Sequence, residues 1–132
     1  MNERPIVMVV EDDTEMNQLE RELLDVHGLA SVAAYTGVEA LDVVKRCHTD
    51  AVLLDLMLPE MDGFECCKRL RGLNSHRLPV VIVSALDSED CRRRGFECGA
   101  DAYFAKPFDP DEVIQTIRNL IAANVHPARQ AR

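Results

Sequence analysis

Tryptophan is absent from the sequence, and aromatic residues make up only 5% of it. A flavin site that stacks the cofactor on an indole ring is therefore not supported, and no Ser/Thr-rich phosphate loop follows the first apolar run, residues 5–10. Long apolar runs are also missing, since none approaches the roughly 18 residues of a membrane span. The N-terminal stretch MNERPIVMVV leads straight into acidic residues, unlike a signal peptide. We therefore predict a cytoplasmic protein with no membrane-spanning segment.

Basic residues are in the minority, with 15 Lys and Arg against 23 Asp and Glu and a net charge of −8. Binding to nucleic acid requires a basic face that contacts the phosphates. The one run of basic residues, at 92–94, is more typical of a solvated helix face. We therefore predict that this domain does not bind nucleic acid directly.

The five cysteines are odd in number and form no C-x-x-C pair, and no histidine stands near them at zinc spacing. Reduced thiols that pack in the interior are the favoured interpretation, with redox sensing as the weaker alternative. At 132 residues the chain fits one domain that needs neither a metal nor a disulfide to stabilise its core.

Short apolar runs, each typical of a strand, recur along the chain at residues 5–10, 30–34, 51–55, 79–84 and 101–105. Three of them are nearly unbroken, which indicates strands covered on both faces, as in a parallel sheet. Segments with helical spacing lie between them, the first built on Met16, Leu19, Leu23, Leu24 and Val26. The others fall at 38–44, 64–73 and 113–121, and residues 87–98 form the weakest helix, with Gly95 inside. The pattern predicts a doubly wound (βα)5 α/β fold, a three-layer sandwich with helices on both faces of the sheet.

Helix boundary signals agree with this division of the chain. Gly28 and Gly72 fall where helices are expected to end, and Asp109 followed by Pro110 predicts a helix start. No linker interrupts residues 1–123, so we predict one domain there. Residues 124–132 are predicted to be a C-terminal tail or the start of a linker.

Polar groups follow four of the five predicted strands. In a parallel α/β sheet the ligand crevice lies beyond the carboxyl ends of the strands. Glu11 and Asp12 follow the first strand and Asp55 ends the third, so three carboxylates are expected near one another. Such crowding requires a proton or a cation, and a hard ion such as Mg²⁺ fits oxygen ligands. The next acid, Asp13, is better explained as the cap of the first helix.

A carboxylate beside Mg²⁺ can act as a nucleophile and form an aspartyl phosphate. Transfer of a phosphoryl group depends on neutralising the charge of its oxygens. Lys106 and Ser84, which end the fifth and fourth strands, offer an ammonium and a hydroxyl for this purpose. The alternatives are a lysine that lies at a strand end without such a role and a serine that caps the next helix.

Four motifs together resemble the receiver domain of bacterial two-component response regulators over about residues 5–123. They are VVEDD, LLDLMLPEMDGFE, PVVIVSA and GADAYFAKPF, in the order and spacing of that family. The resemblance implies a flavodoxin-like, CheY-like fold with a five-stranded sheet of strand order 2-1-3-4-5. It implies that Asp55 is the phosphoacceptor and that Lys106, followed by a cis Pro107, binds the phosphate. The implied Mg²⁺ ligands are Asp12, Asp55 and the backbone carbonyl of Met57, with Glu11 acting through water. Ser84 and Tyr103 are the implied switch pair.

The implied function is a phosphorylation-dependent signalling switch rather than an enzyme with turnover. Asp55 would accept its phosphoryl group from a sensor histidine kinase or a histidine phosphotransfer protein, with Mg²⁺ or Mn²⁺ as cofactor. Ser84 and Tyr103 would relay the change to the face formed by the fourth helix, fifth strand and fifth helix. The implied output is a downstream protein or a fused effector domain, and a phosphorylation-dependent homodimer is an open alternative.

Some positions depart from the family pattern. Ala102 and Thr116 replace an aspartate and an arginine that receivers of the OmpR/PhoB class use to dimerise, although Asp101 and Glu112 remain. That type of dimer is therefore in doubt.

Two other classes of protein compete with this interpretation. Haloacid dehalogenase-type phosphatases carry a second aspartate two residues after their nucleophile, where this chain has Met57. A pseudo-receiver that binds partners without phosphorylation is disfavoured by the intact set of site residues.

Overall fold

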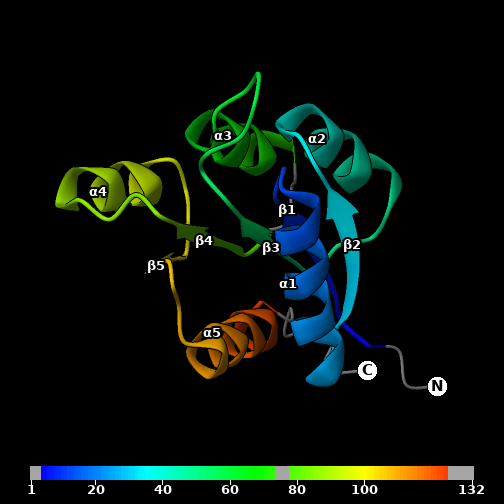
Figure 1. The fold of residues 1–132 in the computed structure, drawn as a ribbon. Helices are drawn as coiled ribbons and strands as arrows, with labels where there is room; N and C mark the ends of the chain where they lie inside the picture. The colour runs from blue at the N-terminus through cyan, green and yellow to red at the C-terminus, as the bar shows by residue number, and fades with distance from the viewer. Residues whose placement is uncertain (1–3, 74–77, 125–132) are drawn as a thin grey trace.

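Strands and helices alternate along the whole chain in a computed structural model that describes residues 4–73 and 78–124 (Figure 1). The strands are β1 (Ile6–Val10), β2 (Ala30–Ala34), β3 (Ala51–Leu54), β4 (Val80–Ser84) and β5 (Ala102–Ala105). The helices are α1 (Thr14–Val26), α2 (Gly37–Arg46), α3 (Gly63–Leu73), α4 (Glu89–Glu97) and α5 (Pro110–Ala123).

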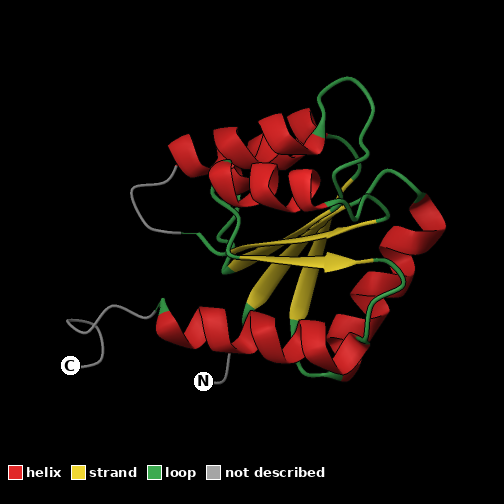
Figure 2. Ribbon diagram, turned by 90° about the vertical axis from the view of Figure 1, so that its left-hand side faces the viewer, coloured by secondary structure: helices red, strands yellow, loops and turns green. Residues whose placement is uncertain are grey.

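The strands form one sheet in the order β2-β1-β3-β4-β5, and every neighbouring pair is parallel. Helices lie on both sides of this sheet (Figure 2). The predicted fold class and strand order are confirmed. Parallel neighbours require long crossovers, and the alternating helices supply them.

Each face of the sheet has its own apolar core, because successive side chains of a strand point to opposite faces. In β1, Val7 and Val9 pack with Leu24 of α1 and Ile117 of α5. Met8 and Val10 point the other way, into a core completed by residues of α2, α3 and α4. This double coverage explains the nearly unbroken apolar runs of the central strands.

Most helix starts lie where the capping signals place them. Asp13 caps α1 by accepting a hydrogen bond from the Met16 amide at 3.0 Å, so the prediction for Asp13 is confirmed. Asp109 caps α5, with Pro110 in its first turn. Helix α3 ends at Leu73, as the predicted segment 64–73 does, one residue beyond the glycine at 72. Strand β3 ends at Leu54, one residue earlier than predicted, although the Asp55 amide still donates to the Val10 carbonyl at 3.0 Å.

Gly95 has a packing role inside α4, the helix with the weakest sequence signal. A β-carbon at this position would lie 3.0 Å from Cδ2 of Tyr103 and 3.1 Å from Cδ1 of Ile82. The missing side chain therefore allows α4 to approach β4 and β5 closely, which offsets the low helix propensity of glycine.

The predicted apolar stripe of α1 is partly wrong. Leu19 is 58% exposed and Val26 is 80% exposed, whereas the buried residues of this helix are Asn17, Glu20 and Leu24. Two of these three are polar, so a search for apolar periodicity does not find them. The helix is held against the sheet through polar contacts as well as apolar ones.

Arg71 of α3 ties together three segments that are distant in the sequence. Its guanidinium donates to the carbonyl of Gly99 at 2.6 Å, to the carbonyl of Leu78 and to the carboxylate of Asp101. Asp101 also accepts a hydrogen bond from the Val80 amide at 2.9 Å. Asp101 is thus engaged inside the domain, by Arg71 and by the Val80 amide.

Some remaining expectations concern the cysteines, the tail and membrane spans. All five cysteines are free, and burial raises the pKa of the Cys66 and Cys67 thiols to about 12, as expected of packing thiols. The predicted tail falls outside the described residues except for Asn124, the cap of α5. Among the helices of residues 4–73 and 78–124, none has the length and apolar character to cross a bilayer.

Candidate functional site

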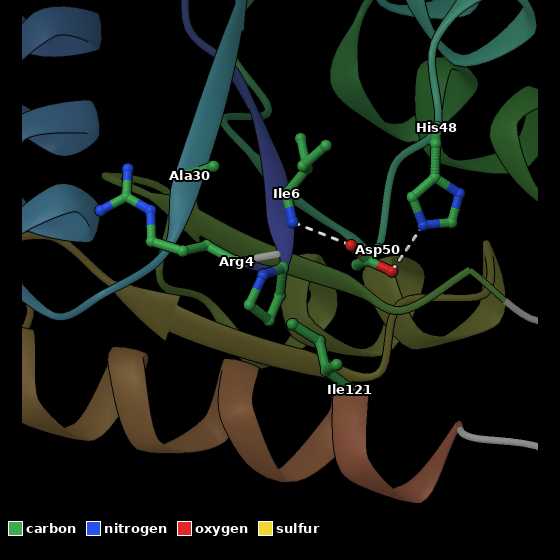
Figure 3. A pocket seen from close by; sticks show the side chains of 7 residues that line it. Arg4, Ile6, Ala30, His48, Asp50 and Ile121 are labelled. Atoms are coloured by element: carbon green, nitrogen blue, oxygen red, sulfur yellow. Dashed lines mark hydrogen bonds and ion pairs between the residues drawn. The ribbon is translucent and has the colours of Figure 1, made fainter. Parts of the chain in front are cut away.

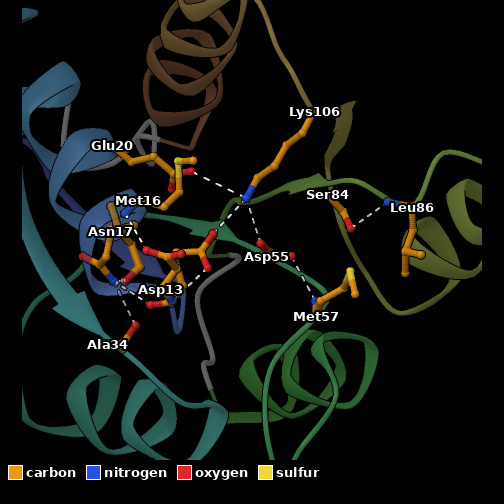
Figure 4. A network of polar contacts seen from close by, with 12 residues as sticks. Asp13, Met16, Asn17, Glu20, Ala34, Asp55, Met57, Ser84, Leu86 and Lys106 are labelled. Carbon is orange, nitrogen blue, oxygen red and sulfur yellow. Dashed lines mark hydrogen bonds and ion pairs between the residues drawn. The ribbon is translucent and has the colours of Figure 1, made fainter.

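The sequence-predicted site residues gather at the carboxyl edge of the sheet. Glu11 and Asp12 follow β1, Asp55 follows β3, Ser84 ends β4 and Lys106 follows β5. Because all five strands are parallel, their carboxyl ends meet at one edge, where α/β proteins bind ligands. Figure 4 shows Asp55, which follows β3, and Lys106, which follows β5, pointing toward each other there.

Lys106 joins the strands β1 and β3 at this edge. Its Nζ lies 2.8 Å from Oε1 of Glu11 and 2.8 Å from Oδ2 of Asp55, and both carboxylates are buried (Figure 4). Burial alone would lower the pKa of Lys106, but the hydrogen bonds to Asp55 and Glu11 outweigh it and raise the pKa. The lysine is therefore charged at physiological pH.

Glu11 is a strongly perturbed acid. Burial and the neighbouring carboxyl of Asp55 raise its pKa to about 7, against the opposing effects of Lys106 and the Asp13 amide. The Asp13 amide donates to Oε2 of Glu11 at 3.1 Å. One ammonium thus does not fully compensate two buried carboxylates, and the site favours an additional cation.

Asp55 is held in place by the loop that follows it. Its Oδ1 accepts a hydrogen bond from the Met57 amide at 2.9 Å, while Oδ2 faces Lys106. Gly63 supports this loop from α3, and a β-carbon there would lie 2.3 Å from Cα of Leu56. A glycine at position 63 is therefore required for the close packing of α3 against the segment that carries Asp55.

The expected Mg²⁺ site has two direct carboxylate ligands, Asp12 and Asp55, with Glu11 acting only through water. Within residues 4–73 and 78–124, no group of three His, Cys, Asp or Glu side chains is arranged to hold a metal ion. Mg²⁺ does not need such a group, because it usually takes one or two carboxylates and keeps several waters. Asp12, which is exposed, and Asp55 fit this pattern, and the excess negative charge at Glu11 and Asp55 is what a cation would neutralise.

The side chains of Ser84 and Tyr103 are both hydrogen-bonded to the backbone of Leu86. Ser84 is fully buried, and its Oγ accepts a hydrogen bond from the Leu86 amide at 3.1 Å. Tyr103 points inward, and its hydroxyl donates to the Leu86 carbonyl at 2.5 Å. Arg92 lies over the Tyr103 ring, with its guanidinium carbon 5.1 Å from the ring centroid. The two residues predicted as a switch are thus linked through the loop between β4 and α4.

Pro107 follows Lys106 through a cis peptide bond, as the resemblance implied.

Sequence reasoning missed two buried polar residues of α1. Nδ2 of Asn17 donates to the carbonyls of Glu11 at 3.0 Å and of Val9 and Ala34 at 3.3 Å, so it fastens α1 to the ends of β1 and β2. Glu20 lies one turn further on, with Oε2 3.9 Å from Nζ of Lys106. Asn17, Glu20 and Leu24 are spaced so that they share one face of the helix, and this spacing could have indicated that the two polar residues are buried. A search for apolar residues alone does not detect it.

A second hollow lies at the opposite edge of the sheet (Figure 3). There His48 Nε2 is 2.8 Å from Oδ1 of Asp50, and Oδ2 of Asp50 accepts a hydrogen bond from the Ile6 amide at 2.8 Å. None of the sequence-predicted site residues lines this hollow. The candidate site is therefore confined to the carboxyl edge.

Known proteins resemble this chain in sequence and in structure. A family model described as the response regulator receiver domain matches residues 7–118. Response regulator MprA of Mycobacterium tuberculosis is 38% identical over 115 residues, which are 87% of this chain and 50% of the relative. The chain thus spans about half the length of the curated relatives it matches.

Two solved receiver domains superpose closely on the structure. The receiver domain of the Francisella response regulator 1452 has a TM-score of 0.85 at 34% identity, over 91% of this chain and 98% of that one. The BeF3-activated N-terminal receiver domain of Klebsiella pneumoniae RstA has a TM-score of 0.82 at 34% identity, over 88% of this chain and 97% of that one. On the matched residues, the sheet order and these likenesses, the chain belongs to the family of response regulator receiver domains of two-component systems.

Proposed function

We propose that the chain is a signalling switch in which Asp55 accepts a phosphoryl group from the phosphohistidine of a sensor kinase or a histidine phosphotransfer protein. The observation that carries the proposal is the 2.8 Å contact of Lys106 with Asp55 at the carboxyl edge of the sheet. It places a charged ammonium beside a buried carboxylate that follows a rigid strand. Phosphoryl transfer depends mainly on such positioning and charge neutralisation.

In the transfer step, a carboxylate oxygen of Asp55 attacks phosphorus and forms the acyl phosphate bond. The P–N bond of the phosphohistidine breaks, and its electron pair goes to the imidazole, which takes up a proton from solvent and leaves as a neutral histidine. The transferred group keeps its negative charge. Lys106, already within hydrogen-bond distance of Asp55, stabilises the oxygens of that group. The Met57 amide, which donates to Oδ1, keeps the carboxylate oriented.

We propose Asp12, Asp55 and the backbone carbonyl of Met57 as the protein ligands of Mg²⁺, with Glu11 acting through a bound water. Mg²⁺, or Mn²⁺ in its place, would neutralise charge on the phosphoryl oxygens. The raised pKa of Glu11 supports a cation here, because burial and then the neighbouring carboxyl of Asp55 raise it despite the ammonium of Lys106.

The response to phosphorylation would begin at Ser84 and Tyr103. Both are hydrogen-bonded to Leu86, so a shift of the Ser84 hydroxyl toward the phosphoryl group disturbs the loop that also anchors Tyr103. Arg92 connects this loop to α4, because it contacts Asp87 at 2.8 Å and donates to the Tyr103 carbonyl at 3.2 Å. The face formed by α4, β5 and α5 is thus the proposed output surface, changed by a shift between two packings.

The output itself is proposed only as a class. Residues 1–123 form the proposed receiver domain, which would act on a downstream protein or on an effector domain fused to it. A homodimer that forms on phosphorylation through the α4, β5 and α5 face is an alternative. It would differ from the charged OmpR/PhoB type, because Asp101 is engaged by Arg71.

Phosphorylation at Asp55 is tested with acetyl phosphate and Mg²⁺ on the wild type and on Asp55→Asn. We expect intact mass spectrometry to show one added phosphoryl group on the wild type and none on the variant. Glu65→Gln, which alters an exposed surface ion pair on α3, serves as the matched control and should be modified like the wild type. Equal modification of Asp55→Asn and wild type would overturn the assignment.

The phosphorylated protein is expected to be long-lived. Met57 and Leu86, at the positions that flank the phosphoryl group in the family, are apolar and are 57% and 37% exposed. Neither side chain can orient an attacking water by hydrogen bonding. After removal of the phosphodonor, we expect the added mass to decay over many minutes or longer, whereas decay within seconds would contradict this interpretation.

A further inference from the structure

Glu20 is a buried carboxylate that the proposed transfer chemistry does not use. Its side chain is only 4% exposed, and among residues 4–73 and 78–124 its Oε2 has no hydrogen-bond partner. Burial raises the pKa of Glu20 to about 7, and the nearby ammonium of Lys106 opposes that shift. A buried carboxylate that only one ammonium, 3.9 Å away, partly compensates costs free energy, which suggests that its position has a functional reason.

The geometry around Lys106 gives Glu20 a specific relation to the phosphorylation site. The ammonium faces three carboxylates, with Glu11 and Asp55 at 2.8 Å and Glu20 at 3.9 Å (Figure 4). Glu20 belongs to α1 and, with Lys106, lines a groove between that helix and the segment after β5. The other residues that line the groove are apolar: Met16, Leu19, Leu23, Pro107, Phe108 and Pro110. Lys106 is therefore the one cationic side chain among the described residues that line this groove.

We propose that Glu20 is a positioning residue that competes with the phosphoryl site for the ammonium of Lys106. The inference rests on the proposed function of Asp55. An incoming phosphoryl group needs this ammonium, while the charge of Glu20 attracts it toward α1 and repels the anionic donor. Glu20 therefore raises the concentration of a small phosphodonor that is needed to load Asp55, and it reserves the site for donors that a protein partner delivers.

The expected change in donor binding can be estimated from the single negative charge of Glu20 near the site that binds the anionic donor. With an effective dielectric constant of about 40 to 80, a unit charge roughly 6 Å from a bound anion changes the affinity for that anion by about 3- to 10-fold. The change concerns mainly binding of the donor, since Glu20 does not touch Asp55 in the contacts described above. Half-saturation and maximal rate should therefore respond differently.

The test measures the initial rate of phosphorylation against acetyl phosphate concentration, at saturating Mg²⁺ and pH 8. We expect Glu20→Gln to lower the half-saturating concentration about 3- to 10-fold while the maximal rate changes less than about 2-fold. Glu20→Asp, which keeps the charge, should remain close to the wild type. Glu22→Gln removes the same charge from an exposed position of α1 and should leave the half-saturating concentration unchanged.

Other outcomes separate the two proposals. If the wild type is phosphorylated but Glu20→Gln has the same half-saturating concentration, the role of Glu20 is wrong and that of Asp55 stands. Equal shifts in Glu20→Gln and Glu20→Asp would indicate an effect of packing and would also overturn it. No phosphorylation of the wild type would overturn the function of Asp55 and this inference together. Glu20→Leu provides a second uncharged variant if Glu20→Gln does not fold, and its half-saturating concentration is judged in the same way.

Discussion

We expect Lys106→Met to slow the phosphorylation of Asp55 by about 100-fold or more. The substitution keeps an unbranched chain of similar size and removes the ammonium that lies 2.8 Å from both Asp55 and Glu11. Without it, the oxygens of the transferred group lose the stabilising charge of Lys106, and the crowded carboxylates repel the anionic donor more strongly. Loss of one such preorganised donor commonly costs two to three orders of magnitude, roughly, in rate.

The measurement is the initial rate of acyl phosphate formation with acetyl phosphate and Mg²⁺, followed by intact mass. Lys45→Met removes the same group from an exposed position on α2 and is the matched control. Thermal unfolding of both variants checks that the sheet is retained. A rate for a folded Lys106→Met within about 3-fold of the wild type would show that charge neutralisation at this edge comes from elsewhere, against the expected loss.

Arg71→Ala is expected to destabilise the domain by about 3–5 kcal/mol. The guanidinium is mostly buried and contacts two carbonyls, those of Leu78 and Gly99, and the carboxylate of Asp101. Its removal leaves Asp101 as a buried charge without the Arg71 ion pair, and two carbonyls with one partner fewer. Most of the cost comes from these groups that stay behind, and less from the attraction that is lost.

Chemical denaturation of Arg71→Ala and Arg69→Ala measures this difference directly. Arg69 lies two residues away on α3 and forms an exposed ion pair with Glu65 at 2.8 Å. Exposed pairs of this kind contribute about 0.5 kcal/mol or less. The same Arg→Ala change on one helix should thus have very different effects, and similar losses of unfolding free energy in the two variants would contradict the role of Arg71.

Most of the fold could be predicted because its signals are local. The nearly unbroken runs at 51–55 and 79–84 indicated strands covered on both faces, and the doubly wound sheet follows from them. Asp13 and Asp109 were found as helix caps because their hydrogen bonds reach only two or three residues along the chain. Thr36, which caps α2 through the Glu39 amide, gives the same kind of signal and could have been found.

The positions that sequence reasoning missed depend on contacts between distant segments. Leu19 and Val26 were assigned to the buried face of α1, but Asn17 and Glu20 occupy it because the ends of β1 and β2 and Lys106 offer them polar partners. Arg71 and Asp101 are 30 residues apart, and no periodicity in either segment indicates that they meet. Such pairs are set by how elements pack against one another.

The sequence by itself determined the order of the elements and the chemistry at the strand ends. Apolar periodicity indicates which segments form strands, and their parallel pairing then brings Glu11, Asp55, Ser84 and Lys106 to one edge. Only the tertiary structure decided that a single ammonium lies among three carboxylates, one of them Glu20 from α1. The physical reason is that burial and Coulomb interactions depend on distances of a few ångströms, and these are fixed when helices and sheet pack together.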